Sequence, residues 1–314
     1  MARIVVAGAG AVGASIAYHL ALLGARDVVL AERAEIASGA TGKAMGGVRQ
    51  QFSTQQEVTL VRESIRLFRE LGGPLFEEVG YLFFATTEDG LGRLRDRADL
   101  QRGFGVPVEE VDPSVVQGLR TDDVLGAVVC REDGVAEPAE VTRELVGRAA
   151  ARGVEVCEHT DARRLSCDVL VIACGAASPE LFPRLPIRPL CRQLVDVGPV
   201  PGLPVDMPMV IEYETGFHFR RDGDTLRLAM TESRPRWTNV EEVDEELVED
   251  WRARLAHRYP PAAGAPVVRA WAGLYDMTPD AHPVIGSRGR VPGGPAGAAC
   301  GRHLLGGDWG WVCK

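Results

Sequence analysis

Hydrophobic residues follow two different patterns along the chain, and the pattern changes near Ile187. Up to that point, short apolar runs alternate with stretches of helical periodicity. The apolar runs predict strands and the periodic stretches predict helices, the strands at 4–7, 28–31, 81–85 and 154–156 and the helices at 14–23, 57–71, 91–101 and 138–152. Strands that alternate with helices in this way are typical of a parallel sheet covered by helices.

From Ile187 onward, apolar and polar residues alternate. This pattern predicts four strands followed by an acidic helix, the strands at 192–197, 209–212, 217–221 and 225–230 and the helix at 241–258. Strands with one apolar face and short connections are typical of antiparallel sheets. The sequence therefore predicts an α/β chain, α+β overall, in which an antiparallel-sheet domain is inserted into a parallel-sheet domain.

The first predicted strand, turn and helix carry a glycine motif that indicates a nucleotide. Gly8 allows a tight turn, Gly10 lets the backbone approach a pyrophosphate, and Gly13 lets the helix pack closely on the strand. The N–H groups at the start of such a helix bind phosphate, and Glu32, at the end of the next strand, is spaced to accept ribose hydroxyls. We expect a dinucleotide here, the alternative being a glycine-rich turn without a ligand.

Composition and charge narrow the class of protein. The chain has 314 residues, 46% of them hydrophobic, so it can bury a large core, and its formal net charge of −9 argues against a nucleic-acid partner. Residues 4–24 are nearly all small or apolar, but Arg3, His19 and the glycine spacing favour a nucleotide fold, so we expect no integral membrane segment. The seven cysteines form no Cys-x-x-Cys pair, which favours a cytoplasmic protein without a metal site.

Three further segments carry a resemblance to a known family. They are the small-residue loop Ser38–Phe52 with Glu32-Arg33 before it, the strand and turn Asp168–Ser178, and the run Trp271–Gly286. In this order they resemble the FAD-dependent D-amino acid oxidase superfamily, closest to its sarcosine oxidase β-subunit, proline dehydrogenase and glycine oxidase-like members. The resemblance spans about residues 3–286.

This resemblance implies a Rossmann-like FAD-binding domain and FAD as the cofactor. It implies that residues 1–80, 136–186 and 266–314 form the FAD-binding domain, and that residues 81–135 and 187–265 form an antiparallel-sheet substrate domain. Carried onto this sequence, it indicates these cofactor-binding residues: Gly8, Gly10, Ala11, Val12, Gly13, Glu32, Arg33, Thr41, Gly42, Lys43, Gly46, Gly47, Val156 and Gly175.

The implied activity is oxidation of the C–N bond of a small secondary amine or amino acid, of the sarcosine, proline, glycine or D-amino acid type, by hydride transfer to the flavin. Arg49, in the glycine-rich loop, is the first candidate for a charge near the ring, the alternative being a structural tether. His282 and Tyr275 are further candidates, and His282 is better explained as the cap of a turn. Arg220, Arg192 and Lys43 complete the set of candidate cations.

Aromatic residues supply candidate walls for a substrate pocket. They are Phe52, Tyr213, Phe217, Phe219 and Tyr275. On strands such residues also form ordinary core packing, and that alternative stays open. The substrate is expected to be a small amine or amino acid, and the electron acceptor oxygen, a quinone or a partner flavoprotein, with the chain acting alone or as a subunit of a hetero-oligomer.

The tail at 291–314 departs from the family pattern, because no helix-length pattern remains where relatives have a closing helix. The segment between Val156 and Asp168 is also short. These departures predict a truncated C-terminus or a shifted reading frame. They leave two alternatives to an active enzyme: a catalytically silent flavoprotein-like subunit or assembly factor, and a truncated inactive fragment. A nicotinamide dehydrogenase is disfavoured, because nothing downstream resembles a nicotinamide-side catalytic domain.

Overall fold

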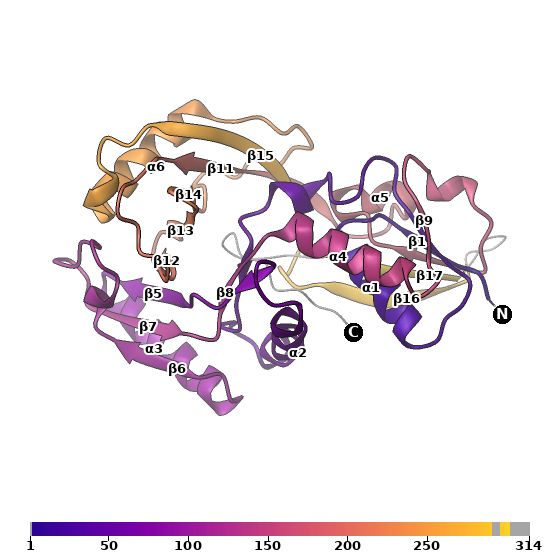
Figure 1. Ribbon diagram of the computed structural model, residues 1–314, viewed down its shortest axis with the longest axis horizontal. Coiled ribbons are helices and arrows are strands. Elements are labelled where there is room, and N and C mark those ends of the chain that lie inside the picture. Colours follow the sequence, from indigo (N-terminus) through magenta and orange to yellow (C-terminus); the bar gives the residue numbers. More distant parts are fainter. Residues whose placement is uncertain (1, 291–295, 302–314) are drawn as a thin grey trace.

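The computed structural model describes residues 2–290 and 296–301. These residues form two lobes that lie side by side, with a small sheet and helix α2 (Gln55–Leu71) between them (Figure 1). Strand β15 (Val267–Met277) belongs to the second lobe and runs back toward the first (Figure 1). Among the described residues, no helix is long and apolar enough to cross a lipid bilayer.

The first lobe is built on a six-stranded sheet. Its order is β16-β17-β10-β1-β2-β9, and only β16 runs antiparallel to its neighbour. The strands are β1 (Ile4–Ala7), β2 (Val28–Ala31), β9 (Glu155–Cys157), β10 (Val169–Ile172), β16 (Val284–Arg290) and β17 (Ala296–Gly301). Helices α1 (Ala11–Leu22) and α4 (Pro138–Ala150) pack on each other and on this sheet, so that small residues of α1 share one core with the strands.

The second lobe is an eight-stranded sheet with the order β15-β11-β14-β13-β12-β5-β7-β6. Its only parallel pair is β12 with β5. Besides β15, the strands are β5 (Tyr81–Ala85), β6 (Val108–Val111), β7 (Gly126–Cys130), β11 (Arg188–Val197), β12 (Met209–Glu212), β13 (His218–Asp222) and β14 (Thr225–Ala229). The helices of this lobe are α3 (Glu88–Gly103) and α6 (Glu245–Arg258), and the largest core cluster lies here.

A three-stranded sheet connects the two lobes. It consists of β3 (Gly47–Val48), β8 (Gly134–Ala136) and β4 (Phe76–Glu77) in the order β3-β8-β4. The short helix α5 (Ser178–Leu181) follows β10. The predicted fold class is confirmed: a mainly parallel sheet and a mainly antiparallel sheet are formed from interleaved parts of one chain.

Several elements differ from the sequence-based expectation. The acidic helix begins at Glu245 rather than at 241, because the Asp244 side chain caps it by accepting hydrogen bonds from the N–H groups of Glu246 and Leu247. Strands β6, β7 and β8 were not expected, since their short runs lack a clear alternation. Strand β17 was also not expected, and the predicted loss of a closing helix falls mainly on residues 302–314, outside the described residues.

Gly13 offers a test of the close packing in the first lobe. A Cβ atom there would lie 1.8 Å from the carbonyl oxygen of Gly8, which no rotamer can relieve. We therefore expect Gly13→Ala to lower the free energy of unfolding by about 3 kcal/mol or more, measured by urea titration. As a control, Gly147→Ala on the exposed face of α4 has open space around its Cβ and should raise stability by about 0.5–1 kcal/mol. A Gly13→Ala protein as stable as the wild type would contradict this packing.

Candidate functional site

A pocket of about 360 Å³ lies where strands β1, β2 and β10 end. The turn from β1 into α1 forms one wall through Gly8, Gly10 and the residues that follow it. On the side of the second lobe, the lining includes Leu274 and Asp276 of β15. The carboxyl ends of parallel strands are the usual ligand-binding edge of such a sheet, so the position of this pocket fits a nucleotide.

The glycines of the turn are required by close backbone approaches. Gly8 has a φ of +100°, and a Cβ there would lie 2.5 Å from the carbonyl oxygen of Ala173. At Gly10 a Cβ would lie 3.1 Å from the Thr41 hydroxyl, on the side of the pocket. Gly10 is the N-cap of α1, and because glycine has no side chain, it cannot cap the helix with a side-chain hydrogen bond. The turn is thus a cradle that larger side chains would fill, at the positive end of the α1 dipole.

Glu32 is held rigidly at the edge of this pocket. Its carboxylate accepts hydrogen bonds from the N–H of Ala9 at 2.8 Å and from the N–H of Ala34 at 3.0 Å. Each carboxylate oxygen can accept a second bond, so Glu32 can still receive hydroxyl groups of a ligand. Nearby, Arg33 forms an exposed ion pair with Glu180 at 2.6 Å, and both residues line the pocket.

The predicted cofactor residues fall into two groups. One group lines the pocket: Gly8, Gly10, Ala11, Val12, Glu32, Arg33, Thr41 and Gly175. The other group packs nearby without lining it: Gly13, Gly42, Lys43, Gly46, Gly47 and Val156. Thr41 has a structural task as well, because its hydroxyl accepts a hydrogen bond from the N–H of Ala11 at 3.0 Å.

Some pocket residues were missed by the sequence analysis. Asp161 and Thr160 come from the loop after β9, and Cys174 comes from the turn after β10. Burial raises the pKa of the Cys174 thiol to about 11, so it stays protonated at neutral pH. Glu241 reaches the pocket from the second lobe and pairs with Lys43. Only tertiary structure brings Thr160, Asp161 and Glu241 to the pocket, so no local signal could have found them, whereas Cys174 directly precedes the predicted Gly175.

Arg49 is buried within the loop Ser38–Phe52, with 8% of its surface exposed. Its guanidinium carbon is 4.7 Å from the centroid of the Phe52 ring and 5.4 Å from that of Phe83. Guanidinium groups stack favourably on aromatic faces, so the two rings hold this positive charge in place. The residues that follow, Gln50 and Gln51, donate hydrogen bonds to the buried carboxylate of Asp133.

Arg220, a predicted substrate cation, is engaged by the protein itself. Its Nε donates to the carbonyl oxygen of Met45 at 2.7 Å, and its Nη2 donates to Glu137 at 3.0 Å. Its third nitrogen faces the backbone of Arg221 and the carboxylate of Asp222. This arrangement favours a role for Arg220 in holding the loop at Met45 over direct contact with a substrate.

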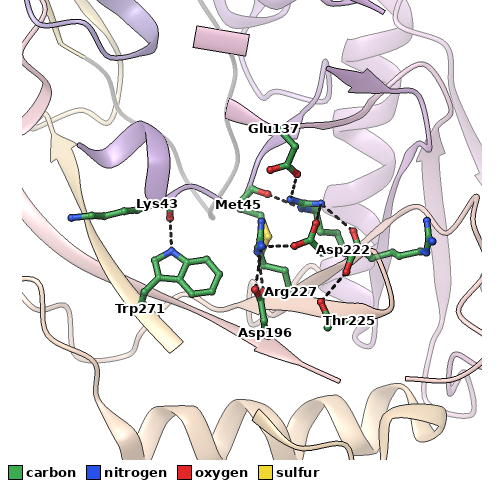
Figure 2. A network of polar contacts seen from close by, with 10 residues as sticks. Lys43, Met45, Glu137, Asp196, Asp222, Thr225, Arg227 and Trp271 are labelled. Atoms are coloured by element: carbon green, nitrogen blue, oxygen red, sulfur yellow. Dashed lines mark hydrogen bonds and ion pairs between the residues drawn. The ribbon is translucent and has the colours of Figure 1, made fainter. Parts of the chain in front are cut away.

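The partners of Arg220 belong to a polar network that extends across the second sheet, and Met45, Glu137 and Asp222 are labelled in Figure 2. Arg227 donates to Asp196 at 2.9 and 3.1 Å and also to Asp222. Its guanidinium stacks on Trp271, whose indole N–H donates to the carbonyl oxygen of Lys43 at 3.0 Å. Sheet side chains therefore hold the loop backbone at both Lys43 and Met45.

The remaining candidates take different positions. His282 lies in a turn, where its backbone N–H donates to the Asp280 carboxylate. Its ring nitrogen Nδ1 is 3.3 Å from the Glu57 carboxylate. Arg192 pairs in register with Gly273, whose Cβ position would lie 3.1 Å from the Cβ of Lys43. By strand alternation Tyr275 shares the face of Gly273.

The candidate aromatic walls also divide. Phe217 and Phe219 are buried in the core of the second lobe, and the Phe219 ring packs on Tyr259. Their positions favour core packing. Tyr213 is partly buried and stacks with Arg97, while Phe52 contacts Arg49. Phe52 is therefore a candidate wall residue that contacts a candidate functional charge.

The fully buried Asp133 gives a pH prediction. Burial raises its pKa from 3.8 to about 7, so the folded state binds this proton more tightly than the unfolded state. Its contribution to the free energy of unfolding is full below about pH 4 and is lost as the pH rises to about 7. Urea titrations of wild type and Asp133→Asn should show the wild type losing stability relative to the variant over this range. If the free energies of unfolding of the two proteins changed in parallel with pH, the raised pKa of Asp133 would be refuted.

Comparison with known proteins agrees with this geometry. A family described as "FAD dependent oxidoreductase" (DAO) matches residues 3–311. The mouse mitochondrial pyruvate dehydrogenase phosphatase regulatory subunit is 30% identical over 168 residues, covering 51% of this chain and 19% of that protein. Human mitochondrial sarcosine dehydrogenase is 26% identical over 339 residues, covering 93% of this chain and 37% of that protein. The chain thus spans well under half the length of these relatives.

A solved structure is similar over almost the whole chain. The crystal structure of glycine oxidase from Geobacillus kaustophilus has a TM-score of 0.80 and 26% identity, and the match covers 98% of this chain and 91% of that one. The family match and the pocket agree with the resemblance found in the sequence, which is confirmed. The chain belongs to the DAO family of FAD-dependent oxidoreductases.

Proposed function

We propose that this chain holds FAD in the pocket at the ends of β1, β2 and β10 and oxidises the C–N bond of a small secondary amine or amino acid. One observation carries the proposal. The pocket begins at the glycine turn Gly8–Val12 and Glu32 of the first lobe and continues to Leu274 and Asp276 of the second. A nucleotide that starts at the turn is therefore directed toward the sheet that carries the candidate substrate cations.

The residues present fit FAD. The backbone of the turn and the start of α1 suit a diphosphate, and the Glu32 carboxylate suits the adenosine ribose. When bound, FAD supplies the group that accepts a hydride, that is, two electrons and a proton, from the substrate. The protein must then orient the substrate, exclude water and provide charge at fixed positions.

Arg49 is the residue proposed to provide that charge. Its burial between Phe52 and Phe83 keeps water away and strengthens its field. A carboxylate-bearing amine would be attracted to this guanidinium, and Arg192 on β11 of the second lobe is a second candidate cation. The names of two similar proteins, sarcosine dehydrogenase and glycine oxidase, support an amino-acid substrate.

The proposal includes oxygen, a quinone or a partner flavoprotein as the electron acceptor, and a cytoplasmic location. Cys130, Cys157, Cys167, Cys174 and Cys191 are free, which fits a reducing compartment. Because similar proteins include mitochondrial ones, cell fractionation is the test of location.

A second candidate function is that of a flavoprotein-like subunit without turnover. The relative that is 30% identical is named as a regulatory subunit, which favours this alternative. Both candidates require the FAD pocket. They differ in whether an amine reduces the bound flavin.

Anaerobic mixing with sarcosine, L-proline, glycine and D-alanine separates the two. We expect one of these amines to bleach the visible absorption of the bound flavin. Arg49→Ala should keep its FAD but reduce the bleaching rate at least about tenfold, because a charge-assisted hydrogen bond contributes about 1.5–3 kcal/mol. Gly92→Ala, on the exposed side of α3 with open space at its Cβ, is the control. Equal rates in Arg49→Ala and wild type would remove Arg49 from the mechanism, and no bleaching by any amine would favour the silent subunit.

A further inference from the structure

The loop that carries Arg49 continues into two buried amide side chains. Gln50 is 3% exposed and Gln51 is 5% exposed. Buried amide groups need hydrogen-bond partners, because an unmade bond costs the full desolvation of the group. The partner that both glutamines share is Asp133, more than eighty residues away in the sequence.

Asp133 lies in the turn between β7 and β8 and is completely buried. Its Oδ1 accepts hydrogen bonds from the N–H of Gln50 at 2.8 Å and from the Gln50 side chain at 3.3 Å. Its Oδ2 accepts one from the Gln51 side chain at 3.1 Å. Three N–H donors therefore converge on one carboxylate.

The chemistry of this cluster requires an acid. A carboxylate accepts on both oxygens and donates nothing, so it satisfies three converging donors. The Gln51 amide cannot turn round to suit another partner, because the same nitrogen donates to the carbonyl oxygen of Tyr81 at 3.0 Å. An asparagine at position 133 would place an N–H₂ group against one of these donors. Burying a carboxylate costs free energy unless hydrogen bonds compensate for the lost water. The three donors from Gln50 and Gln51 provide that compensation.

Arg49 depends on this cluster through the chain next to it. The carbonyl oxygen of Gln50 accepts a hydrogen bond from the N–H of Phe52 at 2.8 Å. The carbonyl oxygen of Phe52 accepts one from the Gln101 side chain at 2.9 Å. The ring of Phe52 is in turn one of the two faces on which the Arg49 guanidinium stacks. A shift of Gln50 would therefore move both Arg49 and its aromatic support.

We propose that Asp133 is a positioning residue: by binding Gln50 and Gln51 it fixes the guanidinium of Arg49 between Phe52 and Phe83. This inference rests on the proposed function for its effect on oxidation. Its structural part, that Asp133 holds the loop at residues 46–53, stands independently of any substrate.

Hydrogen exchange of the full FAD-bound chain tests the structural part. At about pH 8, Asp133→Asn should speed amide exchange in peptides covering residues 46–53 at least about tenfold, with α4 unchanged. The control is Asp123→Asn, which weakens the ion pair of Asp123 with the buried Arg258 and should leave residues 46–53 unchanged. Unchanged exchange at 46–53 in Asp133→Asn, or an equal increase throughout the chain, overturns the proposal.

If Asp133→Asn does not fold, Gln51→Met provides the same test. It removes the donor to Oδ2 and keeps a side chain of similar length, so the same loop-confined increase in exchange is expected. Exchange at residues 46–53 equal to that of the wild type would overturn the proposal in this variant as well.

The functional part is tested by a double-mutant cycle with whichever of the four amines reduces the wild-type flavin. Asp133→Asn alone should slow flavin reduction at least about tenfold with FAD content unchanged, and in the Arg49→Ala background it should slow it by less than about twofold. Additive losses would overturn action through Arg49. If no amine reduces the wild type, the proposed function fails, while the exchange data still decide whether Asp133 holds the loop.

Discussion

The close approach of helix α1 to the turn after β1 is the constraint on which the nucleotide site depends. The Cβ positions of Gly8 and Gly13 are both taken by backbone oxygen atoms. Because nothing larger than hydrogen fits there, the start of α1 is held against the ends of β1 and β10. The pocket, the helix dipole and the Glu32 carboxylate meet at one point for this reason.

A second constraint fixes the loop between the lobes. Trp271 and Arg220 bind the carbonyl oxygens of Lys43 and Met45 from the second sheet, and β3 pairs with β8. Beyond β3, Asp133 binds the two glutamines. The loop is thus attached to the second sheet at its start and to the β7–β8 turn at its end. A side chain held in this way would lose little entropy on binding a charged ligand, which is the role proposed for Arg49.

Local features of the sequence predicted the part of the site that depends on local geometry. The glycine spacing, the strand before it and Glu32 are all found within one βαβ unit, and the structure places them around one pocket. The alternating pattern after Ile187 likewise predicted β11 to β14. The domain boundaries and the roles of the individual site residues remain predictions.

Features that depend on contacts between distant segments could not be predicted. Arg220 looks like a substrate cation on a strand, and only the fold shows that Met45 and Glu137 occupy its donors. Asp133 precedes a glycine and resembles an ordinary surface turn, yet it is fully buried, and Gln50 and Gln51 donate hydrogen bonds to it. Neither burial nor partner is encoded in the neighbouring residues.

The most direct measurement is a calorimetric titration of FAD into cofactor-stripped, folded protein, with Gly10→Val beside it. A valine at position 10 would project toward Thr41 and into the space assigned to the diphosphate. The account predicts one FAD per wild-type chain, competition by ADP, and no uptake by a folded Gly10→Val protein. Folded wild type that takes up no FAD, or a Gly10→Val variant that binds it equally well, would contradict the account.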